Sequence, residues 1–186
     1  MRALLPNVFL FLAVACCAAP GGVSYAANPE LKRTLVFRGV SYFYRWSQND
    51  QTEFTPEKQE DLNKWTDMIT VNGYPDAGDG ERLAATANAV LENYKNHRAT
   101  VLKTRSVRRT ADRPAEHLIA VKFTRPGFIE VAFARFALVN GKGHSFVYSH
   151  RIYGARMDDQ MNAWLSANGD EVEKALLELA SAPPII

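Results

Sequence analysis

The feature that most constrains the fold is a run of β-strand patterns in the second half of the chain, joined by short turns. The patterns cover residues 100–107, 116–124, 128–139 and 144–153. Asn140-Gly141, between the last two, is a strong hairpin signal because both residues tolerate positive φ angles. Consecutive strands with such short connections pair antiparallel. We therefore expect an antiparallel sheet in this part of the chain.

The segment 128–139 is apolar on both faces of the expected strand. Because side chains alternate along a strand, Ile129 and Phe133 lie on one face, and Ala132 and Phe136 lie on the other. A strand buried on both faces lies inside a sheet, with helices or a second sheet covering it. We therefore expect this strand to be central.

The N-terminal half is expected to add further strands. Leu35–Trp46 predicts one long strand, since β-branched and aromatic residues are abundant there. Thr52–Phe54 is expected to return as a short partner strand after a turn at 47–50, and Met68–Tyr74 follows as another extended segment. The whole chain then has about six to seven strands.

Helices are expected in three parts of the chain. Thr55-Pro56 favours a short helix, because threonine caps helices and proline suits the first helical position. Glu81–His97 carries an apolar stripe of helical period. Asn168-Gly169 is expected to separate two C-terminal helices. Helices set apart from consecutive strands predict an α+β fold, with an antiparallel sheet covered by a central helix and C-terminal helices.

The first 26 residues have the pattern of a secretory signal peptide. Arg2 precedes an apolar run over 4–19, which is shorter than a bilayer span requires, and Ser24–Ala26 fits a cleavage site. In a second interpretation Ala13–Cys16 is a lipobox and Cys16 becomes the acylated first residue of a lipoprotein. We therefore expect an exported protein, either periplasmic or secreted, or else anchored in the membrane by lipid.

Composition limits the classes of function that we consider. Cys16 and Cys17 are the only cysteines and precede the expected cleavage, so the mature domain has no thiol chemistry and no disulfide. The formal net charge of +2 gives no general attraction to nucleic acid. No transmembrane segment is expected. The expected organisation is a signal peptide at 1–26, a flexible segment at 27–34, one α+β domain at 35–180 and a flexible tail at 181–186.

One local concentration of positive charge is a candidate binding patch. Its arginines are Arg105, Arg108, Arg109 and Arg113. Arginine side chains bind carboxylates, phosphates and acidic partners through paired hydrogen bonds. The alternative interpretation is an exposed loop between two strands. We expect this patch to contact a protein partner or a small ligand.

Two histidines are candidates for metal ligands or catalytic residues. His144 and His150 share one face of a strand, but no Asp, Glu or Cys lies near them in the sequence to complete a metal site. Ser149 and His150 are adjacent and therefore point to opposite faces, which argues against a catalytic triad. We expect packed or surface histidines, no metal and no cofactor.

A loose acidic group precedes the strand at 68–74. Its members are Glu57, Glu60, Asp61 and Asp67. Two carboxylates at a defined separation can act as general acid and base, but a solvated helix face explains the group as well. If the chain is a hydrolase, at least two side chains among Glu57, Asp61, Asp67 and His150 should meet at one cleft.

The segment Glu53–Glu57, followed by Leu62, Trp65 and Met68–Val71, is similar to a segment of small exported bacterial proteins of uncharacterised function. The order of elements also resembles the Mog1/PsbP-like α+β sandwich group. That resemblance implies an accessory or binding protein with no shared catalytic set. We therefore expect a non-enzymatic exported binding domain with no assigned catalytic residues. The alternatives are a cell-envelope hydrolase that uses acidic residues or His, and a lipid-anchored envelope lipoprotein.

Overall fold

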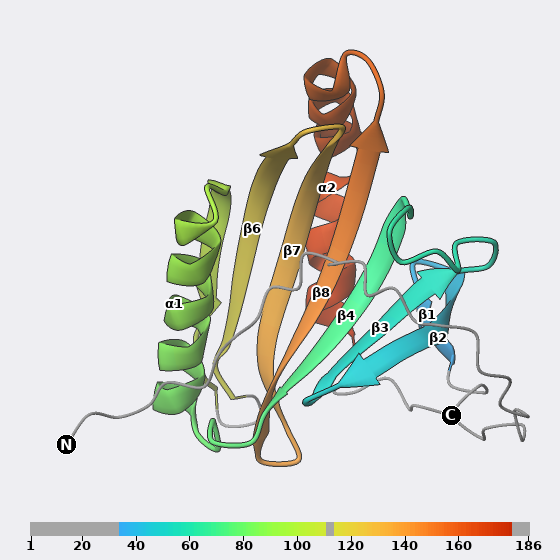
Figure 1. Ribbon diagram of the computed structural model, residues 1–186. Helices are drawn as coiled ribbons and strands as arrows, with labels where there is room; N and C mark the ends of the chain where they lie inside the picture. The colour runs from blue at the N-terminus through green and yellow to red at the C-terminus, as the bar shows by residue number, and fades with distance from the viewer. Residues whose placement is uncertain (1–33, 111–113, 180–186) are drawn as a thin grey trace, which may run out of the picture.

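The computed structural model describes residues 34–110 and 114–179, which form an antiparallel sheet with two helices (Figure 1). The strands are β1 Thr34–Phe37, β2 Val40–Gln48, β3 Gln51–Pro56, β4 Asp67–Tyr74, β5 Thr100–Val107, β6 Glu116–Arg125, β7 Phe128–Val139 and β8 Lys142–Tyr153. The helices are α1 Gly80–Asn96 and α2 Met157–Glu178. The expected α+β class is confirmed, with eight strands in the order β1-β2-β3-β4-β8-β7-β6-β5. The signal peptide, Cys16, Arg113 and the two flexible ends fall largely or wholly outside the described residues.

The two helices cover opposite faces of the sheet. α1 packs on β6 and β7, and α2 packs on β7 and β8 (Figure 1). Phe133 on β7 belongs to the core beneath α2, together with Met161 and Leu176, whereas Phe136 belongs to the core beneath α1. β7 therefore contributes to both cores, which confirms the central, two-faced strand expected at 128–139.

The expected single strand over 35–46 is wrong, because the chain reverses inside it. Arg38 and Gly39 have φ angles of 49° and 75°, and Phe37 pairs with Val40 across them. Two consecutive positive φ angles form the tight turn that suits the twist of a β-hairpin. This turn raises the number of strands to eight and places Arg38 at a hairpin tip.

The expected short helix after Thr55 is also wrong. Thr55 and Pro56 end strand β3, where they pair with Phe43 and Tyr42. The Thr55 side chain is fully buried and donates to the carbonyl of Gln59 at 2.5 Å, so it is not available as a helix cap. Strand pairing therefore outweighs the local helix signal, and residues 57–66 form turns and irregular structure.

The two expected C-terminal helices are one continuous helix, α2. Asn168 lies within it and donates from Nδ2 to the Trp164 carbonyl at 3.0 Å. Met161, Val172 and Leu176 are all fully buried against the sheet. Because one apolar stripe runs along both sides of Asn168, packing keeps the helix intact where the local sequence favours an end.

One ion pair is buried in the part of the sheet that α2 covers. Arg135 on β7 is 4% exposed and donates from Nε and Nη2 to the two carboxylate oxygens of Glu116, each at 2.9 Å. Its Nη1 donates to the carbonyls of Leu176 and Leu179 at 3.0 and 2.6 Å. Arg135 therefore fixes the C-terminal end of α2 to the sheet. Within the described ranges, no helix is long and apolar enough to cross a membrane.

Candidate functional site

A pocket of about 300 Å³ opens where the β1–β2 hairpin lies beside the ends of β4 and β8. Its lining residues are Phe37, Arg38, Val40, Tyr42, Pro56, Asp67 and Tyr148. Aromatic rings make up much of its wall, and it contains one acidic and one basic side chain. We call it the Asp67 pocket.

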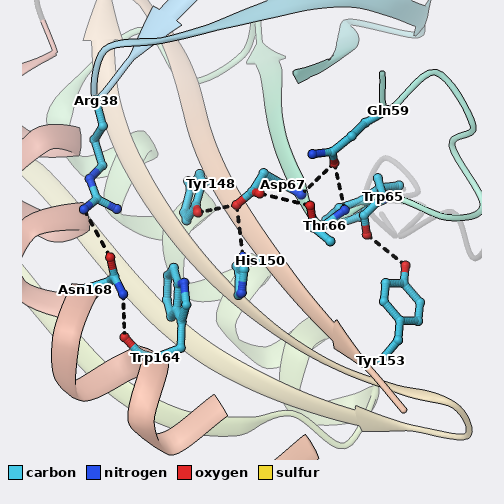
Figure 2. Close-up of polar contacts among 10 residues, drawn as sticks. All are labelled: Arg38, Gln59, Trp65, Thr66, Asp67, Tyr148, His150, Tyr153, Trp164 and Asn168. Carbon is cyan, nitrogen blue, oxygen red and sulfur yellow. Dashed lines mark hydrogen bonds and ion pairs between the residues drawn. The ribbon is translucent and has the colours of Figure 1, made fainter. Parts of the chain in front are cut away.

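Strand pairing positions the acidic group of this pocket. Asp67 begins β4 and pairs with His150 on β8, and the next residue on the same face, Ile69, pairs with Tyr148. The Tyr148 hydroxyl donates to Oδ1 of Asp67 at 2.6 Å, and Nδ1 of His150 lies 3.0 Å from the same oxygen (Figure 2). Thr66 donates its hydroxyl to Oδ2 at 3.1 Å. The carboxylate therefore has a fixed orientation.

The irregular segment 57–66 holds the backbone of Asp67. The side-chain oxygen of Gln59 accepts from the backbone N–H groups of Thr66 and Asp67 at 2.8 and 3.1 Å (Figure 2). Tyr153 donates its hydroxyl to the Trp65 carbonyl at 2.9 Å. The Gln59 bonds hold the end of the segment next to Asp67, and the Tyr153 bond attaches the segment to β8. These bonds therefore fix the backbone at Asp67.

Asp67 is ionised at neutral pH. Burial alone would raise the pKa of its carboxyl, but hydrogen bonds from His150 and Tyr148 outweigh burial and lower that pKa below its usual value. A carboxylate offers about four acceptor positions. Tyr148, His150 and Thr66 occupy one position each, so one position on Oδ2 remains for a further donor.

The phenols beside Asp67 stay protonated and can donate hydrogen bonds. Burial and the charge of Asp67 raise the pKa values of both Tyr42 and Tyr148. Tyr148 uses its hydroxyl on Asp67. The Tyr42 hydroxyl makes no hydrogen bond to any residue that the structure describes, although Tyr42 is only 3% exposed. Tyr42 lines the pocket, and its hydroxyl is a donor that no described residue accepts.

Aromatic rings pack against the two side chains, Tyr148 and His150, that bond to Asp67. The Phe37 and Tyr148 rings are 5.3 Å apart. On α2, Trp164 stacks on His150 with a centroid distance of 4.2 Å and an interplanar angle of 8°. These contacts hold His150 and Tyr148 in place, so that their hydrogen bonds to Asp67 persist.

Arg38 provides the basic group at the mouth of the pocket. Its exposed side chain extends from the hairpin tip toward α2, where Nη2 donates to Oδ1 of Asn168 at 3.3 Å (Figure 2). The positive charge of Arg38 acts against the rise in the pKa values of Tyr42 and Tyr148, which places the guanidinium within electrostatic range of both hydroxyls.

The predicted arginine patch is divided by the structure. Arg105 lies on β5 and bonds through Nη1 to Glu173 of α2 at 2.8 Å, and Lys103 bonds to the other oxygen of the same carboxylate. Arg108 and Arg109 follow β5 and are exposed. Arg105 therefore attaches α2 to the sheet, and only Arg108 and Arg109 remain as described members of a surface patch.

The acidic group and the histidines are arranged differently from the expectation. Glu57 and Asp61 are exposed on the segment 57–66, whereas Asp67 points to His150. Asp67 is an acidic neighbour of His150 that sequence proximity did not indicate, because pairing of β4 with β8 joins residues 83 positions apart. Within the described part of the chain, no group of three His, Cys, Asp or Glu side chains can hold a metal ion.

Of the four candidate side chains of the hydrolase alternative, only Asp67 and His150 are in contact among the described residues. Asp67 and His150 touch, as an oriented general base would require. However, Asp67 lines the pocket and His150 does not, and no other carboxylate lines it. Asp67 also accepts hydrogen bonds from Tyr148 and Thr66.

Comparisons with known proteins give a family and two similar structures. A protein-family model matches residues 30–183, and the chain belongs to that family. No curated protein matches it in sequence. The chain is similar to the Ran-binding protein Mog1p of Saccharomyces cerevisiae, with a TM-score of 0.46 and 10% identity over 76% of this chain and 87% of that one. It is also similar to human STARD10, with a TM-score of 0.30 and 8% identity over 74% of each chain.

Similarity to Mog1p is the coarse part of the expected resemblance, and membership of the Mog1/PsbP-like group stays a prediction. At TM-scores this low, neither structure indicates a ligand or a partner for this chain.

Proposed function

We propose that this family member is a non-enzymatic binding domain that acts outside the cytoplasm and holds a small ligand in the Asp67 pocket. The observation that carries the proposal is an ionised, partly buried carboxylate that lines a pocket together with three aromatic residues. The signal-peptide pattern of residues 1–26 supports an exported location.

The chemistry of the pocket favours a ligand with a protonated amine. A carboxylate binds an ammonium group through a short charge-assisted hydrogen bond. Phe37, Tyr42 and Tyr148 line the same pocket, and aromatic rings can attract cations through their quadrupoles. A volume of about 300 Å³ lies at the small end of ligand pockets, so the ligand is a small molecule.

We expect propylammonium to bind in the Asp67 pocket and Asp67→Asn to weaken that binding about tenfold or more. The substitution removes the charge but keeps the size of the side chain. Tyr42→Phe is a second variant, expected to weaken binding about threefold by removing a hydroxyl that bonds to no described residue. Ligand-observed NMR titration measures the dissociation constants.

Asp170→Asn is the matched control, because Asp170 is an exposed aspartate on α2 away from the pocket. It should bind propylammonium like the wild type. Equal affinities for the wild type, Asp67→Asn and Tyr42→Phe, or an absence of saturable binding by the folded wild type, would refute the proposed function.

A second candidate function is contact with an acidic protein partner through Arg108 and Arg109. The observation that favours it is their position after β5, an edge strand on which seven of the eight residues are exposed. Poly-glutamate serves as a model acidic partner. We expect Arg108→Ala/Arg109→Ala to elute from a poly-glutamate column at a lower salt concentration than the wild type, because two phosphate- or carboxylate-binding side chains are lost.

The control for this test is Arg98→Ala/Lys58→Ala, which removes two exposed basic residues elsewhere on the surface. It has the same net charge as the double arginine variant. If both double variants elute at the same salt concentration, retention reflects net charge alone and the patch has no special role.

A further inference from the structure

We propose that the ligand of the Asp67 pocket is a small zwitterion, with its ammonium group at Asp67 and an oxyanion, either a carboxylate or a phosphate, held by Arg38. This inference rests on the proposed function and adds the second charge of the ligand. It makes Arg38 the residue that selects among small amines.

Opposite charges line the same pocket without neutralising each other. Asp67 and Arg38 are both lining residues, yet no ion pair joins them among the contacts of residues 34–110 and 114–179. The Asp67 carboxylate is directed to Tyr148, His150 and Thr66. An ionised acid and a guanidinium that share a pocket but do not touch leave room for a molecule with both complementary charges.

The position of Arg38 is set by the fold rather than by the side chain alone. It occupies the first position of the two-residue turn, with a φ angle of 49°, and the hairpin packs through Phe37 onto Tyr148. Its only hydrogen bond to a described residue is the 3.3 Å bond to Asn168. A guanidinium has five N–H donors. Most of the donors are therefore free to bind an oxyanion in a paired arrangement.

Ligands with a single charge fit the pocket less well. A simple amine gains the attraction of Asp67 and is repelled by Arg38, whereas a simple carboxylate gains Arg38 and is repelled by Asp67. A zwitterion of suitable length gains both attractions. The small volume limits the connection between its two charges to a short chain.

The test compares probes that differ in charge and length. The single-charge probes are propylammonium and propionate. The zwitterions are glycine, β-alanine, γ-aminobutyrate, 5-aminovalerate and O-phosphoethanolamine. We expect at least one aminocarboxylate or the aminophosphate to bind the wild type about tenfold tighter than propylammonium. The preferred chain length reports the separation of the two charged groups, and the phosphate probe distinguishes the two oxyanions.

Arg38→Gln identifies the residue that confers this preference. We expect the variant to bind the best zwitterion and propylammonium with equal affinity, within about twofold. Arg98→Gln is the matched control, because Arg98 is also an exposed arginine with a positive φ angle of 61° but lies outside the pocket. It should keep the full preference. Both variants should melt near the wild-type temperature, since each side chain is exposed.

The outcomes separate this inference from the proposed function. If propylammonium binds through Asp67 but no zwitterion binds more tightly, the function stands and the zwitterion is refuted. A preference for zwitterions that survives Arg38→Gln also refutes the inference, because another residue then binds the oxyanion. If no probe binds saturably, both proposals fail together.

Discussion

The Arg135→Met variant is expected to lose about 3–5 kcal/mol of its free energy of unfolding. Arg135 is 4% exposed and is the bidentate partner of Glu116, which is 3% exposed. Removing the guanidinium takes two charge-assisted hydrogen bonds away from a buried carboxylate. It also frees the carbonyls of Leu176 and Leu179 at the end of α2. Denaturation with urea at neutral pH measures the loss.

A double variant separates the cost of keeping the Glu116 charge buried without Arg135 from the value of the ion pair itself. Arg135→Met/Glu116→Gln has no buried charge at this position, and we expect it to recover a large part of the lost free energy. Arg98→Met, at an exposed arginine, should change stability by less than about 0.5 kcal/mol. A loss of less than about 1 kcal/mol in Arg135→Met would show that Arg135 does not fix α2 to the sheet.

The Asp67→Asn variant is expected to lose about 1–3 kcal/mol of stability at pH 7, and this loss should disappear in acid. Tyr148, His150 and Thr66 all contact the carboxylate, and an amide cannot accept from them with the same charge. Because hydrogen bonds lower the pKa of Asp67 in the folded state, the ionised form stabilises the fold.

The direction of the pH effect follows from that lowered pKa. A carboxyl with a lower pKa in the folded state contributes stability that is complete above the unfolded-state pKa, about 3.9. This contribution is lost as the pH falls through the folded-state pKa. The difference in free energy of unfolding between the wild type and Asp67→Asn should therefore shrink as the pH falls below about 4.

Tyr148→Phe provides an independent check at the same carboxyl. It removes one of the hydrogen bonds that lower the pKa of Asp67 and leaves the carboxyl in place. We expect the pKa of Asp67, followed by carbon-detected NMR, to be higher in this variant than in the wild type. An unchanged pKa, or a stability difference that is equal at neutral and acidic pH, would contradict this description of Asp67.

Local sequence patterns predicted the parts of the fold whose contacts are local. β6, β7 and β8 are joined by tight turns, and Asn140 and Gly141 adopt the positive φ angles of 49° and 73° that their hairpin requires. α1 has a regular apolar stripe and an aspartate cap at Asp79. In these elements, propensity, periodicity and turn chemistry agree, so the pattern alone was sufficient.

The pattern failed where distant contacts overrode local preference. Thr55 caps no helix because it pairs within the sheet, and Asn168-Gly169 ends no helix because the stripe of α2 continues past it. The turn at Arg38-Gly39 interrupts a run of strand-forming residues. Arg38 occupies a turn position where Asn, Asp or Gly is usual, so the sequence there does not indicate a hairpin.

The Asp67 pocket was beyond the reach of sequence reasoning for the same reason. In the sequence, Asp67 follows the acidic residues of segment 57–61, and no acidic residue lies close to His150. Their contact depends on pairing between β4 and β8, which are separated in the chain by α1, β5, β6 and β7. Arg38 and Asn168 are 130 residues apart, and no local pattern indicates that they meet.

The central claim is that the Asp67 pocket is a ligand-binding site, and the most direct test is to locate where the best probe binds. We would titrate the folded protein with that zwitterion and follow its assigned backbone and indole N–H signals by NMR. The account predicts saturable shifts at 37–42, Asp67 and Tyr148, with the Trp164 indole responding through its contacts with His150 and Tyr148. Shifts elsewhere on the molecule, with none around Asp67, would contradict it.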